Sequence, residues 1–325
     1  MRTLNILAPS LLASASLFAQ APAPAPKPDT PEAQKHVDAA VKAAGKDWVE
    51  AEKYICSPTT VRVNKADDPL IEPVKLFDNL YAMGRDGTVV YAITTSAGIV
   101  LIDAGYADQV ETVLLPQMQK LGLDPVNVKN IIVTHGHGDH FGGSGYFQEK
   151  YHTKVWMSAA DWHVIDLQNQ AAKASGKAQA VTPPKEDLIA DEGRPLTVGD
   201  TKFTIVLAPG HTPGSIAIIF PVKDGGRTRM AGLYGGMFLT PTNPTPEAMH
   251  QYVESVRHYR DVAKMMKVEV EVQNHPLMDG FPDRLTRVAA HKGPNPFVVG
   301  EASYQRFLTI MEECEEAQII RRASN

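Results

Sequence analysis

The chain has 325 residues, 43% of them hydrophobic and 21% charged, which suits one large globular domain or two small ones and excludes a fibrous or wholly disordered protein. Its formal net charge of −5 argues against nucleic acid as a partner, because phosphate binding needs a basic face.

The N-terminus has the features of an export signal. Arg2 supplies the positive charge, residues 4–18 form a run without charges, and Ala19-Gln20-Ala21 is a small-x-small cleavage pattern. A membrane anchor is the alternative, but the apolar run is short and broken by Pro9. We therefore expect residues 1–21 to be a removed signal peptide. The mature chain is expected in the periplasm, without stable membrane association.

An Ala/Pro-rich tether is expected over residues 22–31, because this stretch has no means of burying a core. A helical extension follows over 32–55, with Asp29 or Thr30 as its cap, and Gly45 can divide it into two pieces. We expect this extension to belong to one folded domain that spans residues 32–325.

Short β-branched runs predict strands after residue 74. The predicted strands span 88–95, 98–103, 130–134, 154–158, 202–207, 216–221, 227–234 and 268–273. The predicted helices span 109–121, 144–151, 159–168, 246–267 and 301–322. Gly84-Arg85-Asp86-Gly87 predicts a hairpin turn, and residues 170–185 are expected to form an exposed insertion or mobile loop. Strands followed by mixed strands and helices predict a layered α/β domain.

Two cysteines, Cys56 and Cys314, lie near opposite ends of the mature chain. In an oxidising compartment an even count favours a disulfide, which would staple the two ends of the domain together. Two unpaired buried thiols are the alternative.

A cluster of metal-binding side chains follows the apolar run 131–133. His135, His137, Asp139 and His140 place three imidazoles and one carboxylate within six residues, a set that suits a divalent metal such as zinc. His135 and His137 can point the same way in an extended segment, and the next two can reach a second metal from the following turn. A polar loop with incidental histidines is the less favoured interpretation.

Two more histidines follow predicted strands. His211 lies in Pro-Gly-His-Thr-Pro-Gly after the strand 202–207, and His275 follows the strand 268–273. Each is a weak signal alone. Together they are a stronger signal, because the same arrangement occurs three times: a strand ends and a histidine follows in a turn.

These motifs together resemble those of the metallo-β-lactamase superfamily. The likeness rests on His-x-His-x-Asp-His at 135–140, Gly-His-Thr-Pro-Gly at 210–214, the late His275, and Leu-Ile-Asp-Ala-Gly at 101–105. It implies a four-layer αβ/βα sandwich with a site at one edge. It also implies two zinc ions per chain, the first held by His135, His137 and His211, and the second by Asp139, His140 and His275.

The resemblance is closest to the third, all-histidine subclass of class B β-lactamases, since His140 stands where the most familiar subclass has arginine. Asp103 is then expected to fix ligand orientation by hydrogen bonds, with a simple turn cap as the alternative. Asp139 is expected to orient the nucleophile or relay a proton as well as bind metal. Residues 233–238 lack the Gly-Asp of many superfamily hydrolases, which counts against a glyoxalase II-like function.

The function implied is hydrolysis of a small-molecule substrate, the amide of a β-lactam ring, by a zinc-bound hydroxide. The alternatives are a hydrolase of the same fold acting on another cyclic amide, lactone or ester, a zinc-sequestering protein without activity, and an iron redox protein. Met237 is interpreted as pocket lining. Substrate anchors remain open among Thr240, Thr242, Ser215 and Arg85, and Tyr81 is either part of a flap or ordinary packing.

Overall fold

A computed structural model of the chain describes residues 28–58, 65–175, 183–237, 239, 245–291 and 293–324. The predicted signal peptide, most of the tether, and the candidate anchors Thr240 and Thr242 lie outside the described residues. In the part that is described, no helix is long and apolar enough to cross a membrane.

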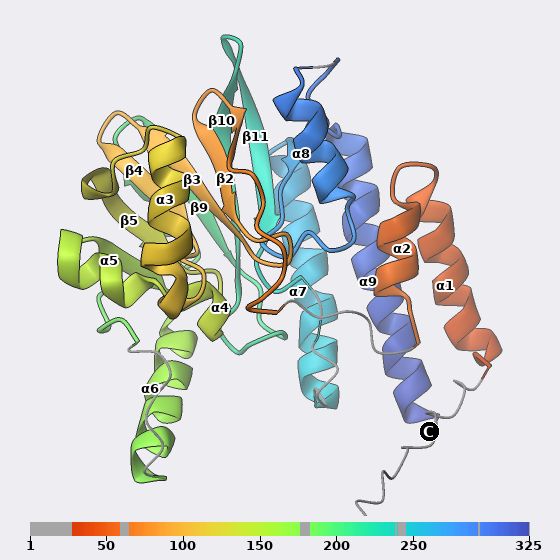
Figure 1. Cartoon of the computed structure of the whole chain (residues 1–325). Helices are drawn as coiled ribbons and strands as arrows, with labels where there is room; N and C mark the ends of the chain where they lie inside the picture. Colours follow the sequence, from red (N-terminus) through yellow and green to blue (C-terminus); the bar gives the residue numbers. More distant parts are fainter. Residues whose placement is uncertain are drawn as a thin grey trace, which may run out of the picture.

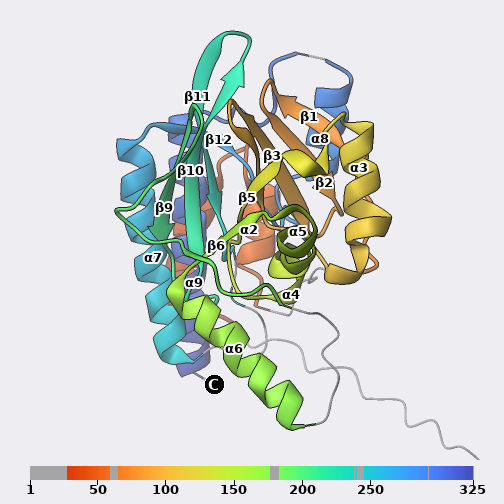
Figure 2. The same cartoon turned by 90° about the vertical axis from the view of Figure 1, so that its left-hand side faces the viewer.

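Two β-sheets form the centre of the molecule (Figures 1 and 2). The first sheet has the order β1-β2-β3-β4-β5-β6-β7 and the second the order β12-β11-β10-β9-β8. The strands are β1 Val74–Phe77, β2 Leu80–Gly84, β3 Val89–Thr95, β4 Gly98–Ile102, β5 Val128–Ile132, β6 Lys154–Met157, β7 Leu188–Ile189, β8 Leu196–Val198, β9 Thr201–Leu207, β10 Ile216–Asp224, β11 Arg227–Tyr234 and β12 Val268–Glu271.

Helices flank both sheets. They are α1 Pro31–Ala44, α2 Val49–Ile55, α3 Leu115–Lys120, α4 Gly138–Phe141, α5 Ser144–Tyr151, α6 Ala159–Ala174, α7 Pro246–Met265, α8 Phe281–Ala289 and α9 Glu301–Ala323. Short turns of 3-10 or π-helix span Ala107–Gln109, Val110–Leu114 and Pro125–Asn127.

The core has three parts that correspond to the layers. Ile102, Ile132 and Ile218 belong to the cluster between the two sheets. Other clusters pack α3 and α5 against the first sheet and α7 and α9 against the second (Figures 1 and 2). This arrangement confirms the predicted four-layer αβ/βα sandwich, in which helices pack on the outer faces of two facing sheets.

The strand directions bring several loops to one edge of the sandwich. Strands β4, β5 and β6 run parallel, so the segments after β4 and β5 leave the first sheet at the same edge. In the second sheet β11 is antiparallel to β10 and parallel to β12, while β9 is antiparallel to β10. Strands β9, β11 and β12 therefore share one direction and also end together. Each predicted ligand follows one of these ends, which explains how residues far apart in the sequence meet.

Most of the predicted elements are confirmed, with shifts of a few residues at their ends. The hairpin at Gly84 is present, since Gly84 pairs with Val89 across β2 and β3. The helical extension is two helices, and Thr30 caps the first by accepting a hydrogen bond from the amide of Ala33. The prediction of a loop from residue 170 is wrong up to Ala174, because α6 continues that far.

The two N-terminal helices pack on the C-terminal helix α9 (Figure 1). A disulfide joins Cys56, at the end of α2, to Cys314 in α9, which confirms the predicted bridge. Arg321 of α9 also forms a two-point ion pair with Asp29. The extension is thus held covalently and electrostatically to the opposite end of the chain.

Candidate metal centre

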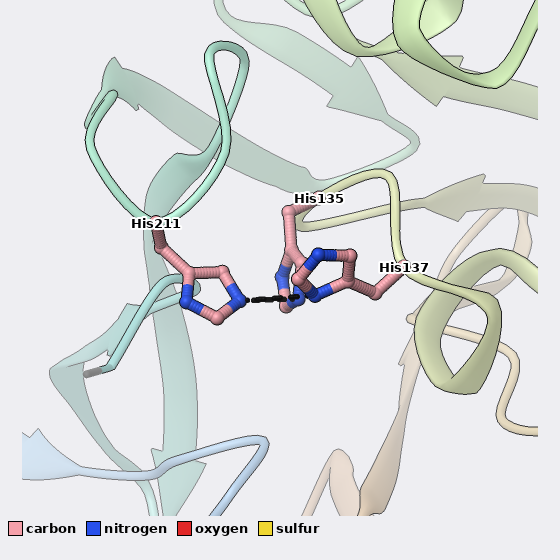
Figure 3. A group of neighbouring side chains, drawn as sticks. All are labelled: His135, His137 and His211. Carbon is pink, nitrogen blue, oxygen red and sulfur yellow. Dashed lines mark hydrogen bonds between the residues drawn. The ribbon is translucent and has the colours of Figure 1, made fainter. Parts of the chain in front are cut away.

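Three histidines from two loops form the first cluster at the shared edge (Figure 3). His135 and His137 lie between β5 and α4, and His211 lies in the turn after β9. Nε2 of His211 is 3.1 Å from Nε2 of His135 and 3.1 Å from Nδ1 of His137. Ligands of a tetrahedral zinc ion at its usual bond lengths lie roughly 3.3 Å apart. The spacing of these nitrogen atoms therefore fits a single metal ion.

A second cluster lies beside the first and consists of Asp139, His140 and His275. Nε2 of His140 is 2.8 Å from Nε2 of His275, and Oδ2 of Asp139 is 3.3 Å and 3.6 Å from these two atoms. The rings of His135 and His140 have centroids 3.9 Å apart, so the two clusters adjoin. All six predicted ligands are thus brought together, in the two groups that the resemblance implies.

Hydrogen bonds on the far side of the rings fix which nitrogen faces the second cluster. Nδ1 of His140 lies 2.7 Å from a carboxylate oxygen of Asp103, and Nδ1 of His275 lies 2.7 Å from the carbonyl oxygen of Gly87. Both partners only accept, so both Nδ1 atoms donate and both Nε2 atoms present lone pairs. With the Asp139 carboxylate, three acceptors converge on one point. Only a proton or a metal cation at that point satisfies them.

The protonation preferences agree with a metal site. Burial lowers the pKa of His135 well below its usual range and lowers that of His275 to about 4. Burial also lowers the pKa of His137. At His140 burial acts in the same direction, but the carboxylates of Asp139 and Asp103 outweigh it and raise the pKa to about 10. A metal ion binds neutral imidazole. Among these four histidines, His140 is the one whose surroundings favour a bound proton, which a metal ion would have to displace.

Asp103 is buried beneath the second cluster and is bonded on every side. It accepts hydrogen bonds from the backbone and hydroxyl of Thr134, from His140, and from the amide of Asn274, the neighbour of His275. Its φ angle is 61°, a left-handed conformation that aspartate adopts more readily than most residues. This placement matches the expected positioning of ligands rather than a turn cap.

Two residues that sequence reasoning missed stand next to the ligands. Asn274 links Asp103 to the carbonyl of Gly235. Asp161, the third residue of α6, accepts hydrogen bonds from the loops of both His135 and His211. The pattern Ser158-x-x-Asp161 is a helix-capping signal, and Ser158 does cap α6. That signal points to the helix and not to the metal site.

Two of the candidate substrate anchors already have hydrogen-bond partners within the protein. Ser215 is fully buried and bonded to Thr212. Arg85 donates to Gln109 and to the carbonyl of Asp68, so its guanidinium is already engaged.

Met237 and Tyr81 both pack against core clusters. Met237 is 1% exposed and packs with the core around Tyr252, so its interpretation as pocket lining is wrong. Tyr81 packs against the core cluster beneath α3, as expected for ordinary packing.

Comparison with known proteins agrees with this geometry. The family model of the metallo-beta-lactamase superfamily matches residues 83–225, which include five of the six ligands. Among solved structures, the Rm3 metallo-beta-lactamase is 25% identical, with a TM-score of 0.60, over 74% of this chain and 91% of that one. BJP-1, a subclass B3 metallo-beta-lactamase of Bradyrhizobium japonicum, is 24% identical, with a TM-score of 0.61, over 86% of this chain and 99% of that one.

The curated relatives match over a shorter stretch. A hydroxyacylglutathione hydrolase of Jannaschia sp. (strain CCS1) is 28% identical over 145 residues, which make up 44% of this chain and 48% of that protein. The chain spans less than half the length of the first curated relatives it matches, between 41% and 49%.

Proposed function

The chain carries a metallo-β-lactamase superfamily domain on the metallo-β-lactamase fold, and from that premise we propose that it is a two-zinc hydrolase that opens the amide of β-lactam rings. The observation that carries the proposal is the convergence of five imidazoles and one carboxylate in two adjoining clusters. Imidazole with one carboxylate suits zinc better than a hard cation such as magnesium.

The residues of the two clusters have different proposed roles. Bound zinc supplies Lewis acidity toward a carbonyl group and lowers the pKa of water, which gives a nucleophile at neutral pH. His135, His137 and His211 would hold one ion. Asp139 lies between the clusters' histidines at 15% side-chain exposure, where its carboxylate can accept a proton from attacking water. Asp103 keeps His140 in the tautomer that binds metal.

Two observations favour a β-lactam over other substrates. The solved structures of similar fold are named as β-lactamases. The described part of the segment after β11, Gly235-Gly236-Met237, has no carboxylate. A Cβ atom at Gly236 would lie 2.7 Å from Cβ of His211, so this position excludes any side chain.

A thioester of glutathione is the second candidate substrate. It is favoured by the names of several curated relatives, which are hydroxyacylglutathione hydrolases. The carbonyl group of a lactone or of another cyclic amide could bind at the same proposed zinc sites.

A hydrolysis panel with zinc control tests the proposal. Purified protein is assayed on a carbapenem, a cephalosporin, a lactone and S-lactoylglutathione, before and after removal of metal by a chelator and again after zinc is restored. We expect β-lactam hydrolysis that the chelator abolishes and zinc restores. His275→Ala should lose it, and the matched variant His258→Ala, a half-exposed histidine paired with Glu192, should keep it. Zinc-dependent cleavage of the thioester alone would transfer the proposal to the second candidate.

We also propose that the mature protein works in the periplasm. The disulfide between Cys56 and Cys314 supports an oxidising compartment. Fractionation of cells that express the full chain, followed by mass measurement of the mature N-terminus, tests both the location and the expected cleavage near residue 21.

A further inference from the structure

Asp161 is a fully buried carboxylate outside the six ligands. It lies in the first turn of α6, where its own amide donates to the capping hydroxyl of Ser158. An aspartate at this place usually remains at the surface near the helix N-terminus. Here the side chain turns inward, and burial raises its pKa although three donors oppose that shift.

All three of these donors belong to the loops that carry the first cluster. The amide of Gly136, between His135 and His137, donates to Oδ2 of Asp161 at 2.7 Å. The hydroxyl of Thr212, the neighbour of His211, donates to the same oxygen at 2.7 Å. The amide of Gly214 donates to Oδ1 at 2.9 Å. One carboxylate thus spans two loops whose nearest ligands are more than 70 residues apart in sequence.

On the His211 side, the hydrogen bond to Asp161 continues to a second hydroxyl group, that of Ser215. Because the hydroxyl of Thr212 donates to Asp161, it can only accept from the hydroxyl of Ser215, 2.7 Å away. Oγ of Ser215 in turn accepts from the amide of Thr212 at 3.1 Å. The Asp161 carboxylate therefore sets the direction of both hydroxyl groups in the turn that bears His211.

The two buried carboxylates contact different parts of the site. Asp103 accepts from His140, a second-cluster ligand, and from Asn274, the neighbour of His275. It also accepts from Thr134, whose hydroxyl lies 3.1 Å from Nδ1 of the first-cluster ligand His135. The hydrogen bonds of Asp161 go to the two loops of the first cluster, from the amides of Gly136 and Gly214 and the hydroxyl of Thr212. Loss of the Asp161 carboxylate should therefore disturb the first metal site and leave the second in place.

We infer that Asp161 is a positioning residue for the first metal site: it clamps the His135–His137 loop to the His211 turn and so sets the spacing of the three nitrogen atoms. The inference rests on the proposed function, since it needs a metal at this cluster. Asparagine at 161 keeps the shape, but its NH₂ group would face at least one of the three donors. The two loops would then separate.

Zinc affinity measured one site at a time tests the clamp. In a His275→Ala background only the His135/His137/His211 cluster is complete, and competition with a chromophoric chelator gives its Kd for zinc. Asp161→Asn should weaken that Kd by about 10–100-fold. Asp166→Asn, an exposed carboxylate on the same helix, is the matched control and should leave it unchanged. In a His211→Ala background, which keeps the second cluster, Asp161→Asn should leave zinc binding as it was.

The possible results distinguish failure of the proposed function from failure of the inference about Asp161. No zinc binding by the His275→Ala protein or its parent overturns the proposed function together with the clamp. Zinc binding that Asp161→Asn leaves unchanged overturns the clamp alone. Circular dichroism of the metal-free variants reports whether they fold. Thr212→Val removes one donor at nearly constant volume and takes over the test if Asp161→Asn is unfolded, and an unchanged Kd in that variant also overturns the inference.

Discussion

Oδ2 of Asp103 lies 2.7 Å from Nδ1 of His140, and both side chains are fully buried. We expect Asp103→Asn to lower kcat/KM by about 10–100-fold and to reduce bound zinc toward one ion per chain. Asparagine tolerates the left-handed backbone at this position, so the change removes the charge and the acceptor and leaves the turn. Metal analysis and steady-state kinetics measure both effects. The surface variant Asp261→Asn serves as control, and retention of two zinc ions by Asp103→Asn would contradict the prediction.

Removal of metal should lower the thermal stability. Without a cation the converging acceptors of Asp139, His140 and His275 have only a proton to share. Zinc at 100 times its Kd contributes about 2.7 kcal/mol. For a domain of about 290 residues, with about 2.1 cal/mol/K of unfolding entropy per residue, this raises Tm by about 4 °C. A thermal scan with and without zinc measures the shift, with magnesium as the control ion. An equal rise with magnesium would argue against a specific zinc site.

A side chain at Gly236 should displace His211. A Cβ atom there would lie 2.7 Å from Cβ of His211, so we expect Gly236→Ala to weaken zinc binding at the first cluster and to lower activity. Gly138→Ala is the matched control in the same site, because a Cβ atom at that glycine meets nothing within 4 Å and its φ is not positive. Zinc titration of both proteins measures the difference. Equal affinities would show that the close contact has no consequence.

The disulfide should stabilise the fold without serving catalysis. Cys56 and Cys314 are 258 residues apart in sequence, so the bridge closes most of the chain into a loop. We expect Cys56→Ser/Cys314→Ser to lose about 2–5 kcal/mol of unfolding free energy and to keep its kcat with zinc bound. Denaturant unfolding with and without a thiol reductant measures this, and the reductant should not affect the double variant. A matching loss of kcat would place the bridge in the active machinery.

The buried carboxyl group of Glu315 should make the free energy of unfolding depend on pH. Burial raises its pKa to about 8 from an ordinary value of 4.5, so the folded state binds a proton that the unfolded state has lost. Stability from this group is complete below pH 4.5 and falls as pH rises toward 8. Glu315→Gln should therefore be more stable than the parent above pH 8, by about 1–3 kcal/mol.

Urea unfolding at pH 5, 7 and 9 measures the effect of Glu315→Gln. The exposed variant Glu149→Gln should follow the parent at each pH. An identical pH profile for Glu315→Gln and the parent would mean that the carboxylate is solvated in the native state.

The ligands could be predicted from the sequence because each depends on a local pattern. His135, His137, Asp139 and His140 form a dense motif after an apolar strand, and that motif needs no long-range information. The core strands were found for the same reason. Strands β1 and β2 were not given ranges, since residues 74–84 mix charged and apolar positions without regular alternation. Helix α8 was also missed, and its packing on β1 is a tertiary contact that no local signal reports.

The residues that support the site could not be predicted. Asp161 reads as part of a helix cap, and its inward direction depends on two loops that meet it only in the folded chain. Arg85 looked available for substrate, yet its hydrogen bonds go to Gln109 and Asp68, which no sequence pattern links to it. Local chemistry thus indicates what binds metal, and only tertiary structure shows what holds the ligands in place.

Helices α1 and α2 pack on α9, so these two N-terminal helices need a C-terminal helix as their packing partner. The N-terminal helices therefore lack their native cover until α9 is available, and this layer folds only after the rest of the domain has been made. A chain truncated before α9 would expose α1, α2 and the outer face of the second sheet together, which makes such fragments direct substrates for proteases and chaperones.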